Sequence, residues 1–466
     1  MQDWLLDSKP ANAIPLILVS EDTFSQWLEN QEASWRRWLE TTGFPAKPNS
    51  ISLIPGQDGA LTAVIVGITS LDDPWACGGL PTALPAGSYY LDTERGLSAP
   101  EAIAIGWGLG TYQYSRYKVP RQIPAKLVLD SLWDGQRIRD QVQAIALVRD
   151  LINVPAEDMM PEQLEETMVA LGQEFDAVVT PVVGDALLAQ NYPLIHAVGR
   201  ASAHPPRLLD LRWGDDNHPQ LALVGKGVCF DSGGLDLKTA NGMRLMKKDM
   251  GGAAHALGLA RLIMSTKLPV RLRVLIAAVE NAVAGNALRP GDVVRSRQGL
   301  TVEIHNTDAE GRLILCDALA EGAAEKPDLL IDFATLTGAA RVALGTEMPA
   351  LFCNNEEMAH GLLTAAADER DPLWRLPLHK PYRELLDSKI ADLANAADTP
   401  YAGAITAALF LQEFIPVDIP WAHFDLMAWN TKSRPGRPEG GEAMGLRAVF
   451  RYVTRRFGSL SEDWAL

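Results

Sequence analysis

Residues 300–324, LTVEIHNTDAEGRLILCDALAEGAA, hold the pattern that decides the fold class. The first five residues form an apolar run that reads as a strand, and the last twelve read as a helix. Between them stand two carboxylates, Asp308 and Glu310, followed by Arg312. Residues at i, i+2 and i+4 lie on one side of an extended chain. We therefore expect these side chains to converge at the carboxyl end of a strand, where open α/β sheets place their sites.

The octapeptide NTDAEGRL, residues 306–313, is ambiguous when it is taken alone. An Asp, a Glu and an Arg at a turn are equally typical of a solvated surface and of the charge pattern at a helix start. The choice between surface and site depends on the sequence upstream.

A second polar constellation follows the apolar run Leu221–Val224, which reads as a buried strand. The segment VGKGVCFDSGG, residues 224–234, carries Asp231, and its glycines allow the backbone to approach a ligand closely. The segment MKKDMGG, residues 246–252, carries Asp249 just before an expected helix. Both aspartates offer the hard oxygen ligands that divalent cations prefer.

The glycines around Lys226 do not indicate nucleotide binding. A phosphate-binding loop has the spacing G-x-x-x-x-G-K-[ST], and here no glycine stands five residues before Gly225. A dinucleotide fingerprint with its ribose-binding acid is also missing from this stretch of sequence.

Four carboxylates, those of Asp231, Asp249, Asp308 and Glu310, would repel one another in a single pocket. Like charges about 4 Å apart repel by ~4 kcal/mol at an effective dielectric near 20. Two divalent cations would neutralise them, and a paired-metal site clamps attacking and leaving atoms. This chemistry predicts a two-metal hydrolase and leaves open whether the substrate is a peptide or a phosphate ester.

Three motifs in this order resemble the leucyl aminopeptidase family, also called cytosol aminopeptidases or M17 metallopeptidases. They are the octapeptide 306–313, the pair of segments 224–234 and 246–252, and DFATLTGA at 332–339. The resemblance covers about residues 145 to 430. It implies a metal-dependent aminopeptidase that releases N-terminal residues, with Leu-like or Met-like residues preferred.

The resemblance also implies metal ligands. Asp231 and Glu310 would bridge two divalent metal ions per subunit, Lys226 and Asp249 would complete the tightly bound site, and Asp308 the exchangeable one. A lysine ligand must be neutral, so its pKa has to fall far below ~10.4. The metals would be zinc or manganese, with magnesium and cobalt as further possibilities, because such donor sets accept all four.

The remaining expected site residues would act on the substrate or on an anion. Lys238 would polarise the substrate carbonyl, and Arg312 would hold a bicarbonate ion that serves as general base. Metal-acidified water would attack the first peptide carbonyl, while the free amine of the substrate binds a metal. The substrate- and anion-binding set implied by the resemblance is Met246, Asn306, Ala309, Gly311, Thr335, Leu336 and Gly338.

Composition bounds the other properties of the chain. With 466 residues, two domains are expected. The net charge of −16 argues against nucleic acid as a partner. Four scattered cysteines fit a reducing cytoplasm, and no apolar stretch reads as membrane-spanning.

The resemblance implies a homohexamer. The alternatives to an aminopeptidase are a two-metal phosphoesterase and a non-catalytic DNA-binding scaffold.

The expected fold is α/β in two domains. Residues 1–130 form a smaller, non-catalytic α/β domain for assembly, residues 131–155 a linker helix, and residues 156–466 the catalytic domain. In the catalytic part strands and helices alternate, which predicts a mostly parallel central sheet covered by helices. The expected strands are 208–211, 221–224, 272–278, 302–305, 329–333 and 422–426. Near the end, Arg447, Arg451 and Arg455 recur every four residues, as on a solvated helix face.

Overall fold

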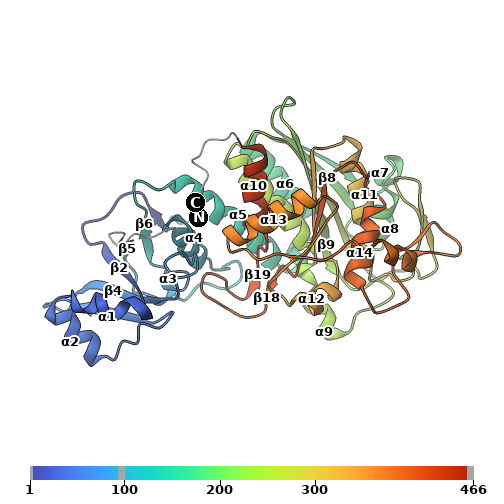
Figure 1. The fold of residues 1–466 in the computed structure, drawn as a ribbon. Coiled ribbons are helices and arrows are strands. Elements are labelled where there is room, and N and C mark those ends of the chain that lie inside the picture. The colour runs from blue at the N-terminus through green and yellow to red at the C-terminus, as the bar shows by residue number, and fades with distance from the viewer. Residues whose placement is uncertain (1–3, 93–99, 459–466) are drawn as a thin grey trace. The chain divides into compact units, whose positions relative to one another are not determined.

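The computed structural model describes residues 4–92 and 100–458 (Figure 1). Within these ranges the chain forms two compact units. The first comprises residues up to 146 together with 432–439, and the second comprises 147–431 together with 440 onward. Helix α5 (Gly135–Asn153) contributes to both units.

The first unit is built on a six-stranded sheet of order β1-β6-β5-β2-β4-β3. Only the β3–β4 pair is antiparallel among its described strand pairs. Trp27, Leu39 and Phe44, from the α1–α2 region, pack on the apolar side chains of β2, β3 and β4. The elements are β1 (Leu5–Leu6), β2 (Ile14–Ser20), α1 (Glu21–Glu29), α2 (Ala33–Thr41), β3 (Ile51–Pro55), β4 (Leu61–Ile68), α3 (Leu80–Ala83), β5 (Ser88–Leu91), α4 (Pro100–Gly110) and β6 (Lys126–Val128).

The second unit contains an eight-stranded sheet of order β15-β14-β17-β13-β9-β10-β8-β7. Its centre, β17-β13-β9-β10, is parallel, as the alternation of strands and helices predicts. The flanks are mixed, because β14 is antiparallel to β17 and because β8 is antiparallel to β10 and β7. The strands are β7 (Val178–Val183), β8 (Arg207–Trp213), β9 (Gln220–Asp231), β10 (Arg271–Asn281), β13 (Leu329–Ala334), β14 (Ala350–Cys353), β15 (Trp374–Arg375) and β17 (Trp421–Asp425).

Helices cover both faces of this sheet. In Figure 1, α6 and α10 lie on one side of β9, and α8 and α11 lie on the other. The helical elements are η1 (Ala156–Asp158), α6 (Pro161–Phe175), α7 (Ala186–Ala189), α8 (Pro193–Gly199), α9 (Ala240–Met243), η2 (Met246–Met250), α10 (Gly251–Ser265), α11 (Glu310–Ala324), α12 (Gly338–Leu344), α13 (Glu356–Asp368), η3 (Lys380–Leu386), α14 (Gly403–Gln412) and α15 (Leu446–Phe457).

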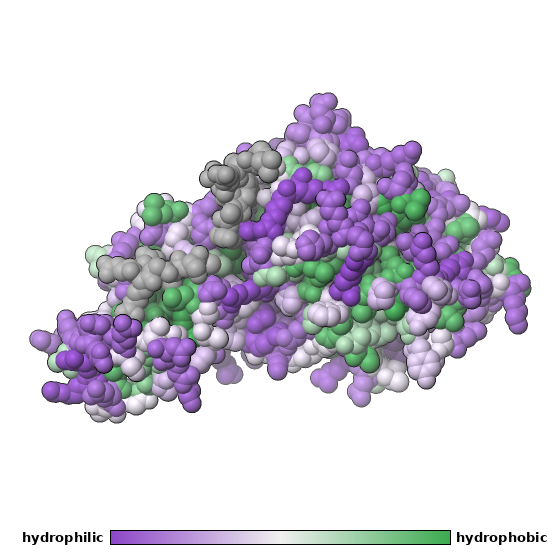
Figure 2. Space-filling model, viewed as in Figure 1, coloured by the Kyte–Doolittle hydropathy of each residue, from purple (hydrophilic) through white to green (hydrophobic). Residues whose placement is uncertain are grey.

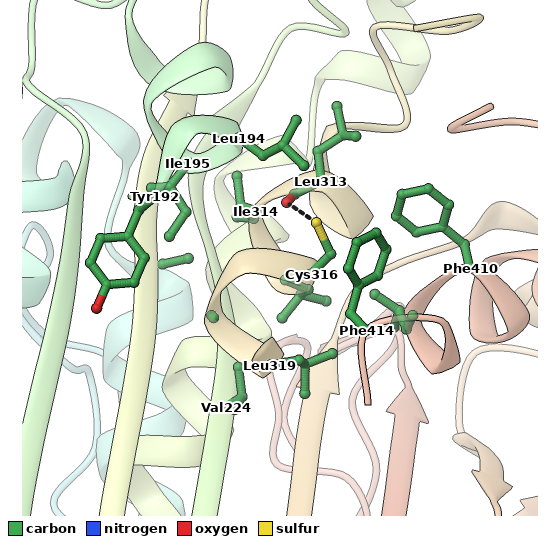
Figure 3. Packing of buried hydrophobic residues seen from close by; sticks show 14 of the residues in the cluster. Tyr192, Leu194, Ile195, Val224, Leu313, Ile314, Cys316, Leu319, Phe410 and Phe414 are labelled. Carbon is green, nitrogen blue, oxygen red and sulfur yellow. Dashed lines mark hydrogen bonds between the residues drawn. The ribbon is translucent and has the colours of Figure 1, made fainter. Parts of the chain in front are cut away.

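The apolar core on the α11 side fixes the helix that begins at the carboxylate turn. Figure 3 shows Leu313, Ile314 and Cys316 of α11 packed with apolar side chains from α8 and from the end of α14. All three are fully buried, and the Cys316 thiol donates to the Leu313 carbonyl oxygen at 3.0 Å. Burial of one full Leu or Ile side chain contributes roughly 1.5–3 kcal/mol, so the first turns of α11 are firmly held.

One expected strand of the central sheet lies elsewhere. Of the expected strand 302–305, only residues 302 and 303 belong to a strand, β12 (Thr301–Glu303), which pairs with β11 (Val293–Arg295) and β16 (Leu393–Ala394) in a separate three-stranded sheet. Hydrophobic alternation predicts a strand but not its partners, and here the paired residues are 6–10 and 91 positions away in the sequence. The fourth sheet has two strands, β18 (Trp429–Asn430) and β19 (Gly440–Gly441).

The arginines of α15 also differ from the expectation of a solvated face. Arg447 and Arg451 are only 5% and 6% exposed, and both approach Glu369 at 3.7–3.8 Å. Only Arg455, which pairs with Asp368 at 2.7 Å, is substantially exposed. Helix α15 packs against α13, and this contact buries the arginine stems.

Hydrophilic residues cover most of the face shown in Figure 2, and apolar residues lie among them in smaller areas. Within the described ranges no helix combines the length and the apolar composition that crossing a bilayer requires.

Candidate metal centre

The centre forms where strand β9 continues beyond its neighbour β13. The two strands pair only as far as Phe333 and Gly225, whereas β9 remains paired with β10 up to Asp231. The edge of β9 beyond Gly225 is therefore not covered by β13, and Lys226 and Asp231 lie along this stretch.

Helix α10 brings Asp249 to the same place. Asp249 lies in the short η2 helix immediately before α10, and both residues at the start of α10 are glycines. A Cβ at position 252 would lie 2.0 Å from the Phe333 carbonyl oxygen. Only glycine permits this close approach of α10 to β13, and the approach places Asp249 over the edge of β9.

The turn before α11 supplies Asp308 and Glu310. One carboxylate oxygen from each of Asp231, Asp308 and Glu310 lies within 4.8 Å of the other two. The Lys226 amine lies 2.8 Å from Asp249 Oδ2 and 3.0 Å from Glu310 Oε1. The structure thus brings together all five residues that the sequence predicts as metal ligands.

Lys238 joins the cluster from the loop after β9. Its amine lies 2.8 Å from Asp231 Oδ2 and donates to Asp308 Oδ1. Its side chain is 16% exposed, against 3% for Lys226. Of the two lysines, Lys238 therefore lies on the side that a substrate can reach.

The prediction that Asp308, Glu310 and Arg312 lie on one extended strand is wrong, although the two carboxylates do come together. Asp308 lies in a turn, and Glu310 begins α11 with Arg312 already inside the helix. Residues two apart on a helix are rotated by about 200°. Glu310 accordingly faces Lys226, while Arg312 donates from Nη1 to the Asn395 carbonyl oxygen at 2.7 Å.

Burial and like charge make the carboxylates poor anions in the absence of cations. Burial, followed by the charge of Asp231, raises the pKa of Glu310 to about 8 and that of Asp308 to about 6. Burial alone would lower the pKa of Lys226, but Asp249, Glu310 and Asp231 outweigh it and raise the pKa. Four carboxylates thus share two ammonium groups, and the cluster retains a deficit of positive charge.

Unpaired buried atoms mark where further cations and anions fit. Among the described residues, Glu310 Oε2 has no hydrogen-bond partner although the residue is only 2% exposed. Arg312 Nε is likewise buried without a partner in this part of the chain. Burial lowers the pKa of Arg312 to about 10, which leaves the guanidinium charged at neutral pH.

The residues expected to contact substrate or anion differ in how directly they contact the five predicted metal ligands. Thr335 donates from Oγ1 to Asp249 Oδ1 at 2.8 Å, and Met246 begins the η2 helix that carries Asp249. A Cβ at Gly311 would lie 2.5 Å from Lys226 Cε. The Leu336 N–H already donates to Asp425 at 3.0 Å.

Three other members of that set lie at element boundaries. The Asn306 side chain accepts from the Asp308 N–H at 2.8 Å, and Ala309 precedes the first residue of α11. Gly338 begins α12, where the Thr337 hydroxyl accepts from Ala340.

Several polar residues at the centre were not predicted from the sequence. Asn281 donates from Nδ2 to Asp231 Oδ1 at 2.8 Å and to the Thr307 carbonyl at 3.1 Å. Asn395 contacts the carboxylate turn, and buried Lys248 has no hydrogen-bond partner within the described ranges. Burial lowers the pKa of Lys248 to about 7. Asn281 ends β10, three residues beyond the predicted strand 272–278, so a strand end near it was the available signal, whereas Asn395 offers no local signal.

The chain is similar to known proteins in both of its domains. Residues 146–450 match the family model described as the cytosol aminopeptidase family, catalytic domain, and residues 14–130 match the M17 aminopeptidase N-terminal domain. The chain belongs to the cytosol aminopeptidase family. As a member of this family it is a metal-dependent aminopeptidase, a hydrolase that removes N-terminal residues, as the sequence motifs predict.

Similar proteins include a probable cytosol aminopeptidase of Syntrophotalea carbinolica, 40% identical over 385 residues that cover 78% of this chain and 77% of the relative. Peptidase B of Enterobacter sp. (strain 638) is 42% identical over 333 residues, covering 69% of this chain and 77% of that protein.

Among solved structures, the cytosol aminopeptidase of Coxiella burnetii has a TM-score of 0.95 and 50% identity, covering 97% of this chain and 99% of that one. The bottromycin maturation enzyme BotP in complex with Mn has a TM-score of 0.86 and 31% identity, covering 96% and 100%. These family matches favour the aminopeptidase over the phosphoesterase and the DNA-binding scaffold.

Proposed function

We propose that this aminopeptidase acts through two divalent cations per subunit, held by Lys226, Asp231, Asp249, Asp308 and Glu310. The observation that carries the proposal is Glu310, a buried carboxylate whose Oε2 lacks a partner among the described residues. Burial and like charge raise the pKa of this carboxyl to about 8, so a cation at Oε2 would stabilise the carboxylate form that the site otherwise disfavours. The donor set, carboxylate oxygens and one amine, fits zinc, manganese, magnesium or cobalt.

The five ligands divide between two positions. Glu310 lies beside Lys226 and Asp231 beside Lys238, and one oxygen of each lies within 4.8 Å of the other. As the family resemblance implies, these two carboxylates would be shared, Lys226 and Asp249 would complete one position, and Asp308 the other. The carboxylates now hold a proton on Lys226, since they raise its pKa. Cation binding at that position must release this proton, so affinity should rise with pH.

Bound cations of this kind acidify water and polarise a carbonyl, which is the chemistry that peptide hydrolysis needs. Lys238 is the side chain placed to act on the substrate. Its amine has three donors and lies between Asp231 and Asp308 on the exposed side of the cluster, where it can donate to the developing oxyanion. The requirement for a free substrate amine at the centre would limit the enzyme to N-terminal residues.

Arg312 is the residue proposed to hold bicarbonate as general base. Its Nη1 is engaged with Asn395, and its buried Nε is free to donate among the described residues, a geometry suited to a small planar anion. Ala309 and Gly311 lie at the N-cap and in the first turn of α11, and their main chain would help to hold the anion, as the family resemblance implies. The Leu336 N–H would have to be shared with Asp425, its present acceptor.

Several finer properties belong to the same proposal. Met246, Thr335 and Gly338 would line the pocket for the first side chain and favour Leu-like or Met-like residues, with Asn306 among the substrate- and anion-binding residues. Manganese is supported by the Mn complex of the similar enzyme BotP. A cytoplasmic location is supported by the names of the cytosol aminopeptidases that the chain resembles, and a homohexamer and the domain limits at 130 and 155 remain part of the proposal.

The test combines metal content with substrate choice. Apo-protein reloaded with Mn²⁺ should bind two ions per chain and hydrolyse leucyl amide, but neither Nα-acetyl-leucyl amide nor a phosphate monoester. Asp308→Ala should retain one tightly bound ion and lose most activity, while Asp216→Ala, an exposed aspartate elsewhere in the second unit, should behave as wild type. Two ions still bound to Asp308→Ala, or cleavage of the blocked amide, would contradict the proposal.

A further inference from the structure

We propose that Asn395 is a positioning residue that fixes the turn carrying Asp308 and Glu310 and orients Arg312. The inference deepens the proposed function and rests on it for the roles of these three residues. Asn395 makes no hydrogen bond to Asp308 or Glu310 itself. It acts through hydrogen bonds to the main chain on either side of Asp308 and to Arg312.

The side chain of Asn395 is fully buried and uses its whole hydrogen-bonding capacity on one turn. Its Nδ2 donates to the carbonyl oxygens of Asn306 and Ala309 at 2.7 and 3.3 Å. Its Oδ1 accepts from the N–H groups of His305 and Asn306 at 2.8 and 3.1 Å. An amide has two donors and two acceptor sites, and here all four contact residues 305–309.

The main chain of Asn395 makes the second connection. Its carbonyl oxygen accepts from Arg312 Nη1 at 2.7 Å. One residue thus holds both ends of the segment, the turn through its side chain and the guanidinium through its backbone. The contact restrains the Arg312 side chain, whose buried Nε has no partner among the described residues and would be available to an anion.

The three-stranded sheet explains why Asn395 reaches this position. β16 runs parallel to β12, with Leu393 opposite Val302 and Ala394 opposite Glu303. The ladder continues one step further, because the Asn395 N–H donates to the Glu303 carbonyl at 2.9 Å. Asn395 therefore lies beside the chain just as it leaves β12 and enters the turn.

No other side chain of similar size can make the same four bonds. Aspartate keeps the acceptors but places an oxygen against two carbonyl oxygens, and alanine leaves both carbonyls and both N–H groups without the side-chain partner. Residues that orient metal ligands typically change metal affinity or activity by about 10- to 100-fold when they are replaced. We expect losses of that size for Asn395→Asp and Asn395→Ala.

A matched control is available in the same unit. Asn354 also joins two main-chain segments, donating to the Ile419 carbonyl at 2.9 Å and accepting from the Trp421 N–H at 2.8 Å. These contacts lie at the beginning of β17, whereas the metal centre lies beyond its carboxyl end. Asn354→Asp and Asn354→Ala should lower stability without affecting the centre.

The experiment uses the full chain and three readouts. Mn²⁺ titration of apo-protein, followed by electron paramagnetic resonance, gives the affinity of each ion. Activity against leucyl amide gives kcat, KM and the bicarbonate concentration for half-maximal rate. Urea unfolding gives the folded fraction. The Asn395 variants should bind the weaker ion about 10-fold less tightly or worse and need more bicarbonate. The Asn354 variants should match wild type in both quantities.

The outcomes separate the inference from the function on which it rests. If Asn395→Ala keeps wild-type Mn²⁺ affinity and bicarbonate dependence in the folded fraction, while only its stability falls, Asn395 is merely structural and the inference is overturned. If wild-type protein binds fewer than two Mn²⁺ ions, the proposed function fails first, and the positioning role fails with it.

Discussion

Gly311→Ala tests the centre without removing any ligand. Position 311 lies in the first turn of α11, and an ideal Cβ there would be 2.5 Å from Lys226 Cε and 2.8 Å from its Nζ. Ordinary contact begins near 3.4 Å, so the end of Lys226 must retreat by roughly 0.6–0.9 Å. Metal–ligand distances tolerate only about 0.2 Å. The variant should therefore lose Lys226 as a ligand, and a displacement near 1 Å costs about 100-fold in activity.

The same substitution should change stability little. The displaced atoms are the flexible end of a side chain, and alanine is favoured over glycine inside a helix by about 1 kcal/mol. We expect the free energy of unfolding of the apo-protein to stay within about 1 kcal/mol of wild type, while kcat/KM for leucyl amide falls about 100-fold and the tighter Mn²⁺ ion binds more weakly.

Gly322→Ala is the matched control, because it makes the same change in the same helix. Its Cβ would meet Leu275 and Leu330 at 3.4 Å, which is ordinary contact. This variant should keep wild-type kcat/KM and metal affinity. Wild-type activity and metal affinity in Gly311→Ala would refute the assignment of Lys226 as a ligand.

Three further predictions concern pH, a buried carboxylate and metal removal. Burial lowers the pKa of His255 to about 4, so on acidification this histidine is protonated in the unfolded chain before it is protonated in the folded one. Its contribution to stability should therefore be complete above about pH 6.5 and fall by up to about 3 kcal/mol toward pH 4. Urea unfolding at several pH values should show a smaller loss in His255→Gln. Asp317 accepts the N–H groups of Leu194 and Arg297, both at 2.8 Å, so Asp317→Asn should lower the unfolding free energy by about 1–3 kcal/mol at unchanged metal content. Chelation should lower the thermal midpoint, and 100 Kd of Mn²⁺ should restore roughly 2.7 kcal/mol, whereas an unchanged midpoint would contradict a site specific to the folded state.

The sequence predicts which residues come together at this centre better than it predicts the local conformation that brings them there. Asp249 lies just before a helix, as predicted. Lys226 and Asp231 lie within β9 (Gln220–Asp231), which extends seven residues beyond the predicted strand 221–224. The same reasoning treated Asp308 to Arg312 as an extended strand end, although α11 begins at Glu310. The helix begins there because Leu313, Ile314 and Cys316 are buried, and this packing overrides the local extended pattern.

Residues that orient the ligands escape prediction for a different reason. The contact between Asn395 and residue 306 spans 89 residues, and it exists only because β16 and β12 pair in a small sheet that no periodicity in the sequence predicts. Asn281 differs, since it ends a long buried strand, and its position beside Asp231 follows once β9 and β10 are paired in register. The position of a residue at this centre can therefore be predicted when it lies on the central sheet, whose strands have a strong hydrophobic pattern. It cannot be predicted when the residue lies on a strand of two or three residues.

This division has a consequence for how the centre is built. The central sheet supplies Lys226, Asp231 and, through α10, Asp249, which are the ligands proposed for the tighter position and the bridge. The small sheet supports the turn of Asp308 and Glu310 through one buried amide. A short strand pair has fewer hydrogen bonds and less buried apolar surface than the eight-stranded sheet, so it opens at lower free energy. The exchangeable character proposed for the Asp308 position thus follows from the element that carries it, and hydrogen exchange should show faster opening at residues 301–309 than at residues 221–229.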